Sequence, residues 1–309
     1  MGSGLALLTR RASTLPQSAP EPVAAQLYRR SRQFFDRFDA LHRFHRAHFD
    51  LHHPAEAALS RRGGQMPIHH LGSDAAADVD IATGAMFLDL FNFRESFIDP
   101  TGLNARQRQL VLAVLMRRAA RPQLTALFEH GTALHRALID AGLPVHSSHY
   151  VPDPGDPFRQ DMQALDYPSD KFDLAVHADV LEHIPDHAAA LSECWRILKP
   201  GGQLIFTTPV FPMRENVLRA EIAADGSLIR HHPDEIHGDN LTGGILAFHN
   251  FGWGLIEDLR RIGFGDVAVE VCLEPRLGLY SSNCPLWTTL DPLQPGNMLP
   301  LVLVARKPG

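Results

Sequence analysis

From Gln123 onward, short apolar runs alternate with amphipathic stretches along the chain. This pattern indicates β-strands alternating with α-helices, and such an order is typical of a parallel sheet with helices on both faces. Strands are predicted at residues 123–128, 145–150, 172–177, 203–208, 267–273 and 299–305, and helices at 133–141, 186–198 and 252–262. The sequence therefore predicts the α/β class, with a doubly wound, mostly parallel sheet.

The first third of the chain follows a different pattern. Large apolar residues recur at near-helical spacing from Val23 to Leu51, which predicts one long helix that Pro54 ends. Residues 85–93 predict a strand, and residues 105–120 predict an amphipathic helix. Three regions are therefore expected: a flexible tail at 1–20, a helical N-terminal extension and accessory region at 21–104, and the α/β domain at 105–309.

The composition excludes several classes of protein. Of the 309 residues, 45% are hydrophobic and 21% are charged, which excludes a wholly disordered or fibrous chain. A formal charge of −6 argues against nucleic acid as the main partner. The chain has no apolar run long enough to span a membrane, and we see no secretion signal. Three scattered cysteines fit a reducing, cytoplasmic compartment.

The predicted first helix carries a row of phenylalanines, among them Phe34, Phe38 and Phe44, and five histidines between His42 and His53. The phenylalanines need burial, so we expect this helix to contact the main domain or to form a homodimer interface. The histidines can share one helical face, but no carboxylate or cysteine nearby completes a set of metal ligands. The sequence therefore predicts a packed or solvated face there, and no metal.

The most informative stretch is FDLAVHADVLEHIPD at residues 172–186, followed by ECWRILKPGGQLIFTTP at 193–209. It resembles the fourth strand, the following helix and the fifth strand of class I S-adenosylmethionine (SAM)-dependent methyltransferases of the type 11 kind. The resemblance covers residues 85–309. It implies a seven-stranded Rossmann-like sheet, SAM as cofactor, and an insertion at about 212–248 that covers a small-molecule or glycan-type substrate.

Polar residues begin where the predicted strand 172–177 ends, with His177, Asp179 and His183. In open α/β sheets, ligands bind beyond the carboxyl ends of the strands. His177 and Asp179 are therefore candidates for lining the cofactor site, and His177 and His183 for accepting a proton. Helix capping by Asp179 and packing of His183 at the strand–helix junction remain alternatives.

The first loop of the α/β domain departs from the glycine-rich GxGxG pattern of most class I enzymes. Between residues 127 and 135 it has a single glycine, in the order Glu129, Gly131, Thr132. These residues match a divergent subgroup of methyltransferase-like proteins. The resemblance implies that Glu129 accepts hydrogen bonds from the SAM ammonium and that Thr132 binds its carboxylate, unless Thr132 only caps the helix.

After the second strand, His149 stands where these enzymes place the acid that binds the ribose, and Tyr150 follows it. A neutral imidazole accepts one hydrogen bond, whereas a carboxylate accepts both ribose hydroxyls. Further along, Asp161 and Met162 resemble the loop that contacts the adenine amino group and ring. Asp161 in a solvated loop is the alternative.

Two other segments resemble the same subgroup. Residues 92–96 and 102–108 resemble a module that carries paired cysteines in many members, but this chain lacks the cysteines, so no zinc is predicted there. Residues 233–253 resemble the insertion after the fifth strand, where His237 is a candidate catalytic residue. Four more residues in this segment or directly before it are candidate bases, substrate ligands or metal ligands: His231, His232, Asp239 and His249.

The leading hypothesis is a SAM-dependent methyltransferase. The altered loops leave a second hypothesis, a methyltransferase-fold protein that is a non-methylating enzyme or a binding or regulatory subunit. A His-ligated metal enzyme is a third hypothesis, based on the histidine-rich segments.

Overall fold

The computed structural model describes residues 21–71, 74–81, 86–87, 90–117, 123–151, 153–238, 244–282 and 298–309. The predicted flexible tail, residues 1–20, lies outside them. Within the described part, no helix has both the length and the apolar character needed to cross a membrane.

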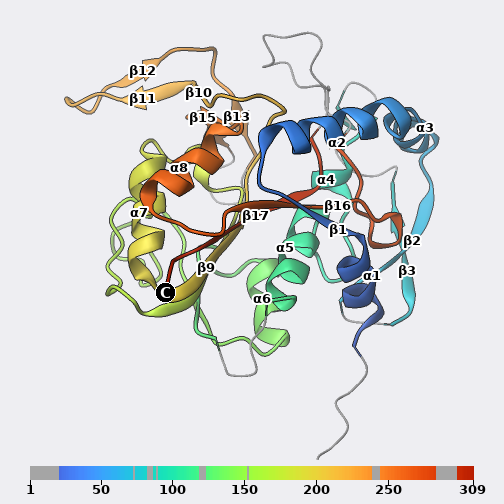
Figure 1. Ribbon diagram of the computed structural model, residues 1–309, viewed down its shortest axis with the longest axis horizontal. Coiled ribbons are helices and arrows are strands. Elements are labelled where there is room, and N and C mark those ends of the chain that lie inside the picture. Colours follow the sequence, from blue (N-terminus) through green and yellow to red (C-terminus); the bar gives the residue numbers. More distant parts are fainter. Residues whose placement is uncertain are drawn as a thin grey trace, which may run out of the picture.

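A seven-stranded sheet runs through the molecule (Figure 1). Its strands lie in the order β1 (Arg32–Phe35), β16 (Ala268–Cys272), β17 (Leu301–Arg306), β9 (Leu198–Thr207), β8 (Phe172–Ala178), β6 (Thr125–Leu127) and β7 (Val145–Ser147). Strands β7, β6, β8 and β9 pair in parallel, whereas β17 and β1 are antiparallel to their neighbours. The predicted α/β class and mostly parallel, seven-stranded Rossmann-like sheet are confirmed.

Helices cover both faces of this sheet. One face packs against α1 (Val23–Ser31), α5 (Ala105–Leu115) and α6 (Ala133–Asp140), and the other against α2 (Phe38–Leu51), α7 (His187–Ile197) and α8 (Gly254–Ile262). Strand β8 is buried along its whole length. Leu174 and Val176 pack on the face that carries α1, α5 and α6, and Ala175 packs on the face that carries α2, α7 and α8. A strand buried on both faces requires the continuous apolar run that the sequence shows there.

The segment between α7 and the body of β9 contains a bulge. Phe172 pairs with Leu198 and Leu174 with Gln203, so residues 199–202 have no counterpart on β8. Gly201 in this segment has a φ of 78°, a left-handed conformation that glycine adopts without strain. At Gly202, a Cβ would lie 2.9 Å from the Lys199 carbonyl oxygen, so no larger residue fits without a shift.

The prediction of one long helix from Val23 to Leu51 is wrong. The chain leaves α1 at Arg32 and forms β1, which pairs with β16 at the edge of the sheet, before α2 begins. Phe35 lies opposite Val269 in this pairing and packs against the core cluster that contains α7 and α8. Helix α3 (His53–Arg62) follows α2 directly, with Pro54 in its first turn, where a missing N–H costs nothing.

The prediction of a single strand over residues 85–93 is also wrong. Strands β4 (Met86–Phe87) and β5 (Leu90–Phe91) pair with each other, and α4 (Phe93–Ser96) begins directly afterwards. The Asn92 side chain accepts a hydrogen bond from the Arg94 N–H and so starts the helix. Helix α5 ends at Leu115, and residues 118–120 of its predicted range lie outside the described residues.

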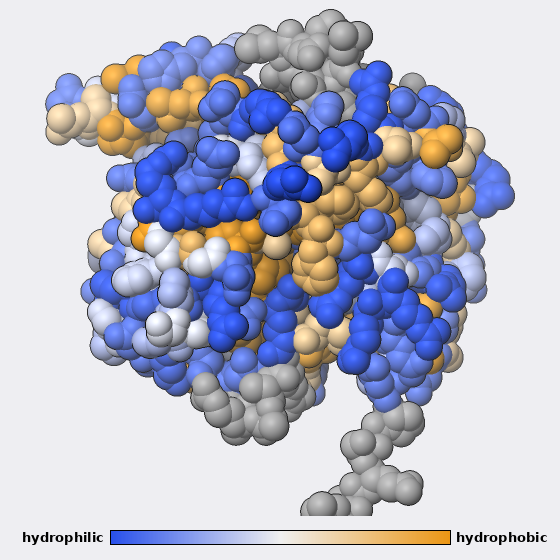
Figure 2. Space-filling model, in the orientation of Figure 1, coloured by the Kyte–Doolittle hydropathy of each residue, from blue (hydrophilic) through white to orange (hydrophobic). Residues whose placement is uncertain are grey.

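Two-stranded antiparallel pairs and 3₁₀ turns complete the described structure. They are β2 (Gln65–His69) with β3 (Ala76–Asp80), β10 (Val217–Leu218) with β15 (His249–Asn250), β11 (Ala220–Ile222) with β12 (Leu228–Arg230), β13 (Ile236–His237) with β14 (Ile245–Leu246), η1 (Leu181–His183) and η2 (Pro275–Leu277). The β11–β12 hairpin projects from the body (Figure 1), and Figure 2 shows apolar side chains on it. Ile222 and Ile229 are among them, both exposed.

A buried ion pair joins the N-terminal segment and α5 to the sheet. Glu270 of β16 has no exposed side-chain surface, and it binds Arg117 directly and Arg32 at 3.3 Å. Removing one partner of such a pair leaves the other charge buried without compensation, which costs about 3–5 kcal/mol.

We therefore expect Glu270→Ala to lower the free energy of unfolding by about 3–5 kcal/mol in a urea titration. Glu221→Ala is the matched control, because Glu221 pairs with His231 on the exposed β11–β12 hairpin and its loss should cost less than about 0.5 kcal/mol. Equal effects of the two substitutions would contradict the assignment.

Candidate functional site

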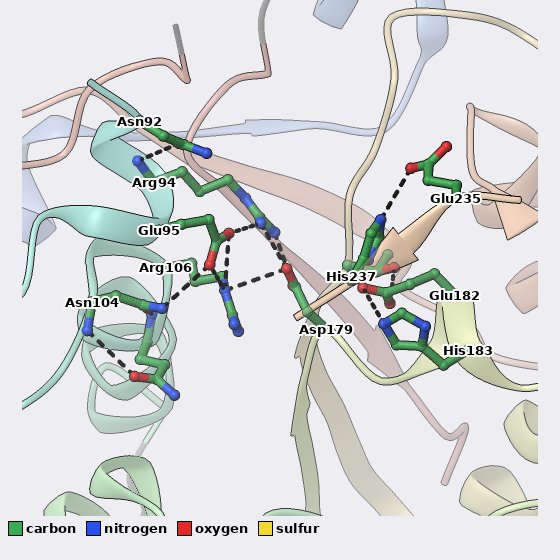
Figure 3. Close-up of polar contacts among 12 residues, drawn as sticks. Asn92, Arg94, Glu95, Asn104, Arg106, Asp179, Glu182, His183, Glu235 and His237 are labelled. Atoms are coloured by element: carbon green, nitrogen blue, oxygen red, sulfur yellow. Dashed lines mark hydrogen bonds and ion pairs between the residues drawn. The ribbon is translucent and has the colours of Figure 1, made fainter. Parts of the chain in front are cut away.

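Asp179 stands directly after β8, at the carboxyl edge of the parallel strands. Its φ of 51° is in the left-handed region, which Asp tolerates better than most residues. Arg94 of α4 donates two hydrogen bonds to its carboxylate, Nη1 to Oδ2 at 2.6 Å and Nη2 to Oδ1 at 2.8 Å (Figure 3). This two-point contact fixes both side chains at the sheet edge.

Arg106 and Glu95 extend the contact into a four-residue network. The Arg106 Nε lies 2.8 Å from Glu95 Oε2 and 3.3 Å from Asp179 Oδ2, and Glu95 also binds Arg94. Burial opposes the charge of Asp179, but Arg106 and Arg94 outweigh it and hold the pKa of this carboxyl well below its usual range. Asp179 is therefore ionised at neutral pH.

Glu129 follows β6 and lies beside this network. Burial raises its pKa to about 7, although the charge of Arg106 and hydrogen bonds with Thr132 and the Ala178 backbone act in the opposite direction. The Thr132 hydroxyl accepts the His135 N–H and caps α6, so the capping alternative for Thr132 is observed. Gly131 has a φ of 78°, and apart from its two chain neighbours no atom of the described residues lies within 4 Å of the position that a Cβ would take.

A second polar group lies further along the same edge and consists of Glu182, His183 and His237. Glu182 and His183 belong to η1, and His237 belongs to β13 in the insertion (Figure 3). The two imidazole rings are 4.9 Å apart, nearly perpendicular to each other. Burial opposes protonation of His237, but its hydrogen bond with Glu235 and the charge of Glu182 raise its pKa above the ordinary value.

His177 lies inside the sheet instead of at its edge. Its ring is fully buried and stacks on Phe206 at a centroid distance of 4.5 Å. Burial lowers the pKa of His177 to about 3, so the imidazole is neutral at neutral pH. Neither ring nitrogen has a hydrogen-bond partner in the described part of the chain. The structure therefore favours His183 and His237 over His177 as proton acceptors.

The residues predicted to bind ribose and adenine follow β7. The backbone of His149 forms an isolated parallel β-bridge with that of Arg159, and the His149 Nε2 lies 3.1 Å from Asp156 Oδ2. Tyr150 is exposed and lies under the Arg159 guanidinium. Two more predicted residues come next: Asp161, whose carboxylate accepts the Gln163 N–H, and Met162, which is buried in the core.

The remaining histidine candidates are dispersed. His48 of α2 is buried and lies 3.2 Å from Glu56, on the wall of a cavity of about 540 Å³ formed with α3 and residues 273–280, not with the Asp179 edge. His231 pairs with Glu221 on the exposed hairpin, and His249 hydrogen-bonds the Pro185 carbonyl. His232 is exposed, and Asp239 lies outside the described residues.

The sequence analysis did not assign Arg94, Arg106 or Glu182 to the site. The two arginines lie in the segments 92–96 and 102–108. The resemblance of these segments to a cysteine-bearing module was the sequence feature that could have pointed to the two arginines. In place of that module, Asp99 accepts hydrogen bonds from Thr101 and from the Leu103 N–H and shapes a turn. This turn separates the helices that carry the two arginines.

Comparison with known proteins places this edge in a protein family. Residues 147–206 match the model of a methyltransferase domain. The matched range runs from the end of β7 through β8 and α7 into β9, and so includes Asp179 and Glu182. This part of the chain is similar to the methyltransferase domain that the model describes.

Individual relatives match this domain over limited lengths. A ubiquinone/menaquinone biosynthesis C-methyltransferase from Vibrio vulnificus is 31% identical over 147 residues, covering 36% of this chain and 54% of the relative. A ubiquinone biosynthesis O-methyltransferase from Pseudomonas putida is 41% identical over 39 residues, which are 13% of this chain and 17% of the relative. The chain thus spans about half the length of the C-methyltransferase relatives.

Among solved structures, a SAM-dependent methyltransferase from Mesorhizobium loti is similar, with a TM-score of 0.40 and 19% identity over 63% of this chain and 96% of that one. A 1,6-didemethyltoxoflavin-N1-methyltransferase from Burkholderia thailandensis has a TM-score of 0.38 and 19% identity over 66% of this chain and 79% of that one.

The charge network of the methyltransferase domain predicts a pH-dependent stability. Because the pKa of Asp179 is depressed in the folded protein, its stabilising contribution is fully present above the unfolded value of about 4, decreases below that value, and is lost only as pH falls through the much lower folded value. We expect Asp179→Asn, which keeps the side-chain shape, to lower the free energy of unfolding by about 3–5 kcal/mol at pH 7 and by roughly 1 kcal/mol less at pH 3.

Urea titrations at both pH values measure this difference. Asp225→Asn is the control, because Asp225 lies in an exposed turn and accepts only from Ser227. An Asp179→Asn effect that is the same at pH 3 and pH 7 would contradict the charge network.

Proposed function

We propose that this protein is a SAM-dependent methyltransferase that acts on a small-molecule or glycan-type substrate. One observation carries the proposal: the carboxylate of Glu129, which follows β6, is within the electrostatic reach of Arg106, whose guanidinium lies 3.3 Å from Asp179 at the end of β8. The Nη1 of Arg106 is buried and has no hydrogen-bond partner among the described residues. A buried donor of this kind calls for an acceptor from outside the protein.

The amino-acid group of SAM fits this pair. Its ammonium matches the Glu129 carboxylate, and its carboxylate matches the Arg106 Nη1. The open space above Gly131 lets a ligand approach the backbone closely, although the loop has one glycine instead of three. This carboxylate and guanidinium therefore suit the two charged groups of an α-amino acid. The match of residues 147–206 to a methyltransferase domain supports SAM as the ligand that carries them.

The ribose and adenine positions follow from the next loop. His149 alone offers a ribose one acceptor, but Asp156 brings a carboxylate to within 3.1 Å of its Nε2. We propose that this pair replaces the usual acid, with Tyr150 and Met162 beside it and Asp161 as the partner of the adenine amino group.

Bound SAM supplies a methyl group made electrophilic by the sulfonium, so the chain mainly has to position the acceptor. In the metal-free protein, His183 at the sheet edge and His237, which faces it from the insertion, are the residues we propose to hold or accept the acceptor's proton. The relatives' names describe C- and O-methyl transfer in quinone biosynthesis, which supports a small-molecule acceptor. Two buried thiols, Cys194 and Cys272, agree with the cytoplasm as the compartment.

One observation favours the alternative, a methyltransferase-fold protein with a binding or regulatory role or another activity. Arg94 engages both oxygens of Asp179, so this carboxylate is not available to a ligand in the described conformation. Binding of neither SAM nor S-adenosylhomocysteine in calorimetry would establish the alternative.

Glu129 gives a sharp test of SAM binding. We expect Glu129→Gln to weaken SAM binding at least tenfold at pH 8, about 1.4 kcal/mol, because it removes the charge opposite the ammonium. Since the pKa of Glu129 is raised to about 7, the wild-type affinity should rise between pH 6 and pH 8, and the variant's affinity should not.

Isothermal titration calorimetry at the two pH values provides the measurement, with Glu221→Gln on the exposed hairpin as the control. A wild-type affinity that is flat with pH, together with unchanged binding by Glu129→Gln, would remove Glu129 from the site.

Asp161 is tested in the same assay. Asp161→Ala should weaken SAM binding by about 1–3 kcal/mol if its carboxylate holds the adenine amino group. Asp225→Ala is a closely matched control, because both aspartates accept the N–H of the residue two positions ahead in a turn. Unchanged affinity would reject the adenine assignment.

A further inference from the structure

Glu182, His183 and His237 form a compact set of metal-type donors. Each residue offers one ligand atom, and these atoms lie within 4.8 Å of one another. They come from two elements, η1 and the insertion strand β13, so tertiary folding brings them together. Figure 3 shows the three side chains converging beside the Asp179 network.

Hydrogen bonds on the outer side of each imidazole set its tautomer. The Nδ1 of His183 donates to the Leu246 carbonyl at 2.9 Å, so in the neutral ring the lone pair is on Nε2, which lies 3.7 Å from Glu182 Oε1. The Nε2 of His237 bonds to Glu235 Oε1 at 3.0 Å, which places its lone pair on Nδ1. Metal-binding histidines are held in this way by a carbonyl or a carboxylate.

Glu182 supplies the third donor. Its side chain is 1% exposed, and Oε2 accepts a hydrogen bond from the Thr208 hydroxyl at 2.8 Å. Oε1 accepts no hydrogen bond in the described part of the chain and faces the imidazole of His183. A buried carboxylate oxygen without a donor is costly, and a cation at this point removes the cost.

We propose that Glu182, His183 and His237 bind one divalent first-row transition ion, with Zn²⁺ as the ion that best matches two imidazoles and a carboxylate. Zn–N and Zn–O bonds of about 2.0–2.2 Å place neighbouring ligands about 3.4 Å apart, so the ion draws the three donors about 1 Å closer. Three protein ligands leave a coordination position for water or a substrate oxygen. This proposal departs from our expectation of no metal and does not depend on methyl transfer.

The test uses the full-length protein, freed of any affinity tag and treated with a chelator. Calorimetric titration with Zn²⁺ at pH 7.5 should give one equivalent bound, and Co²⁺ in its place should give a d–d absorption band that reports nitrogen and oxygen ligation. We expect His183→Ala, His237→Ala and Glu182→Gln each to weaken binding at least 100-fold. Glu235→Gln changes the hydrogen-bond partner of His237 without removing a proposed ligand, and it should weaken binding 10- to 100-fold.

His231→Ala is the matched control, because His231 also pairs with a glutamate in the insertion, but on the exposed surface. It should bind the ion as the wild type does. Circular dichroism of each metal-free variant checks folding, and the rise in wild-type melting temperature on adding Zn²⁺ gives a readout that needs no variant.

Less than half an equivalent of bound Zn²⁺, or equal binding by the wild type and the His183/His237 double alanine variant, would overturn the proposal. Since no SAM is present, this failure is distinct from a failure of the Glu129 test, which concerns only the proposed cofactor.

Discussion

The two-point contact between Arg94 and Asp179 determines how the rest of the functional edge is arranged. A buried carboxylate is stable only with a partner, and a buried guanidinium has the same requirement. The contact joins α4, which precedes the α/β region, to the end of β8 across 85 residues of sequence. Glu95 and Arg106 depend on the same pair, and Arg106 in turn acts on Glu129. The accessory region is thus part of the site and not an appendage.

The fold was predictable wherever local sequence determines it. Strand β8 is a mainly apolar run, α7 begins at the Asp186 cap, and α8 ends at Gly263 with a φ of 116°. Each of these signals lies within a few residues of the element that it specifies. The predicted elements from residue 123 onward therefore agree with the structure to within a few residues at most ends. Asp179 and His183 were expected at the sheet edge because polar residues after a buried parallel strand have few other places to lie, whereas Glu129 was expected from the resemblance of the first loop.

The errors concern contacts between distant segments. The segment that forms β1 looked helical because Phe34 and Phe38 continue a helical spacing. In the structure, Arg32 pairs with Glu270, 238 residues away, and the backbone of β1 pairs with the edge strand β16. A strand that completes a sheet edge gains hydrogen bonds that helix propensity does not reveal. Arg94 and Arg106 were missed on similar grounds, since an arginine becomes a site residue only through a partner elsewhere in the chain.

The charges at the edge fall into two zones with different preferences. In the first zone, the cations Arg94 and Arg106 face three acids, Glu95, Asp179 and Glu129. With Glu129 ionised this zone carries one net negative charge, which complements an amino acid that also bears a sulfonium. The raised pKa of Glu129 agrees with this match, because a ligand cation supplies the missing counter-charge. In the second zone, Glu182 lies beside the imidazoles of His183 and His237, and Arg219 pairs with Glu235 at 3.3 Å. One oxygen of the buried Glu182 carboxylate has no donor among the described residues, which is why we propose the divalent cation for this zone and the cationic cofactor for the first.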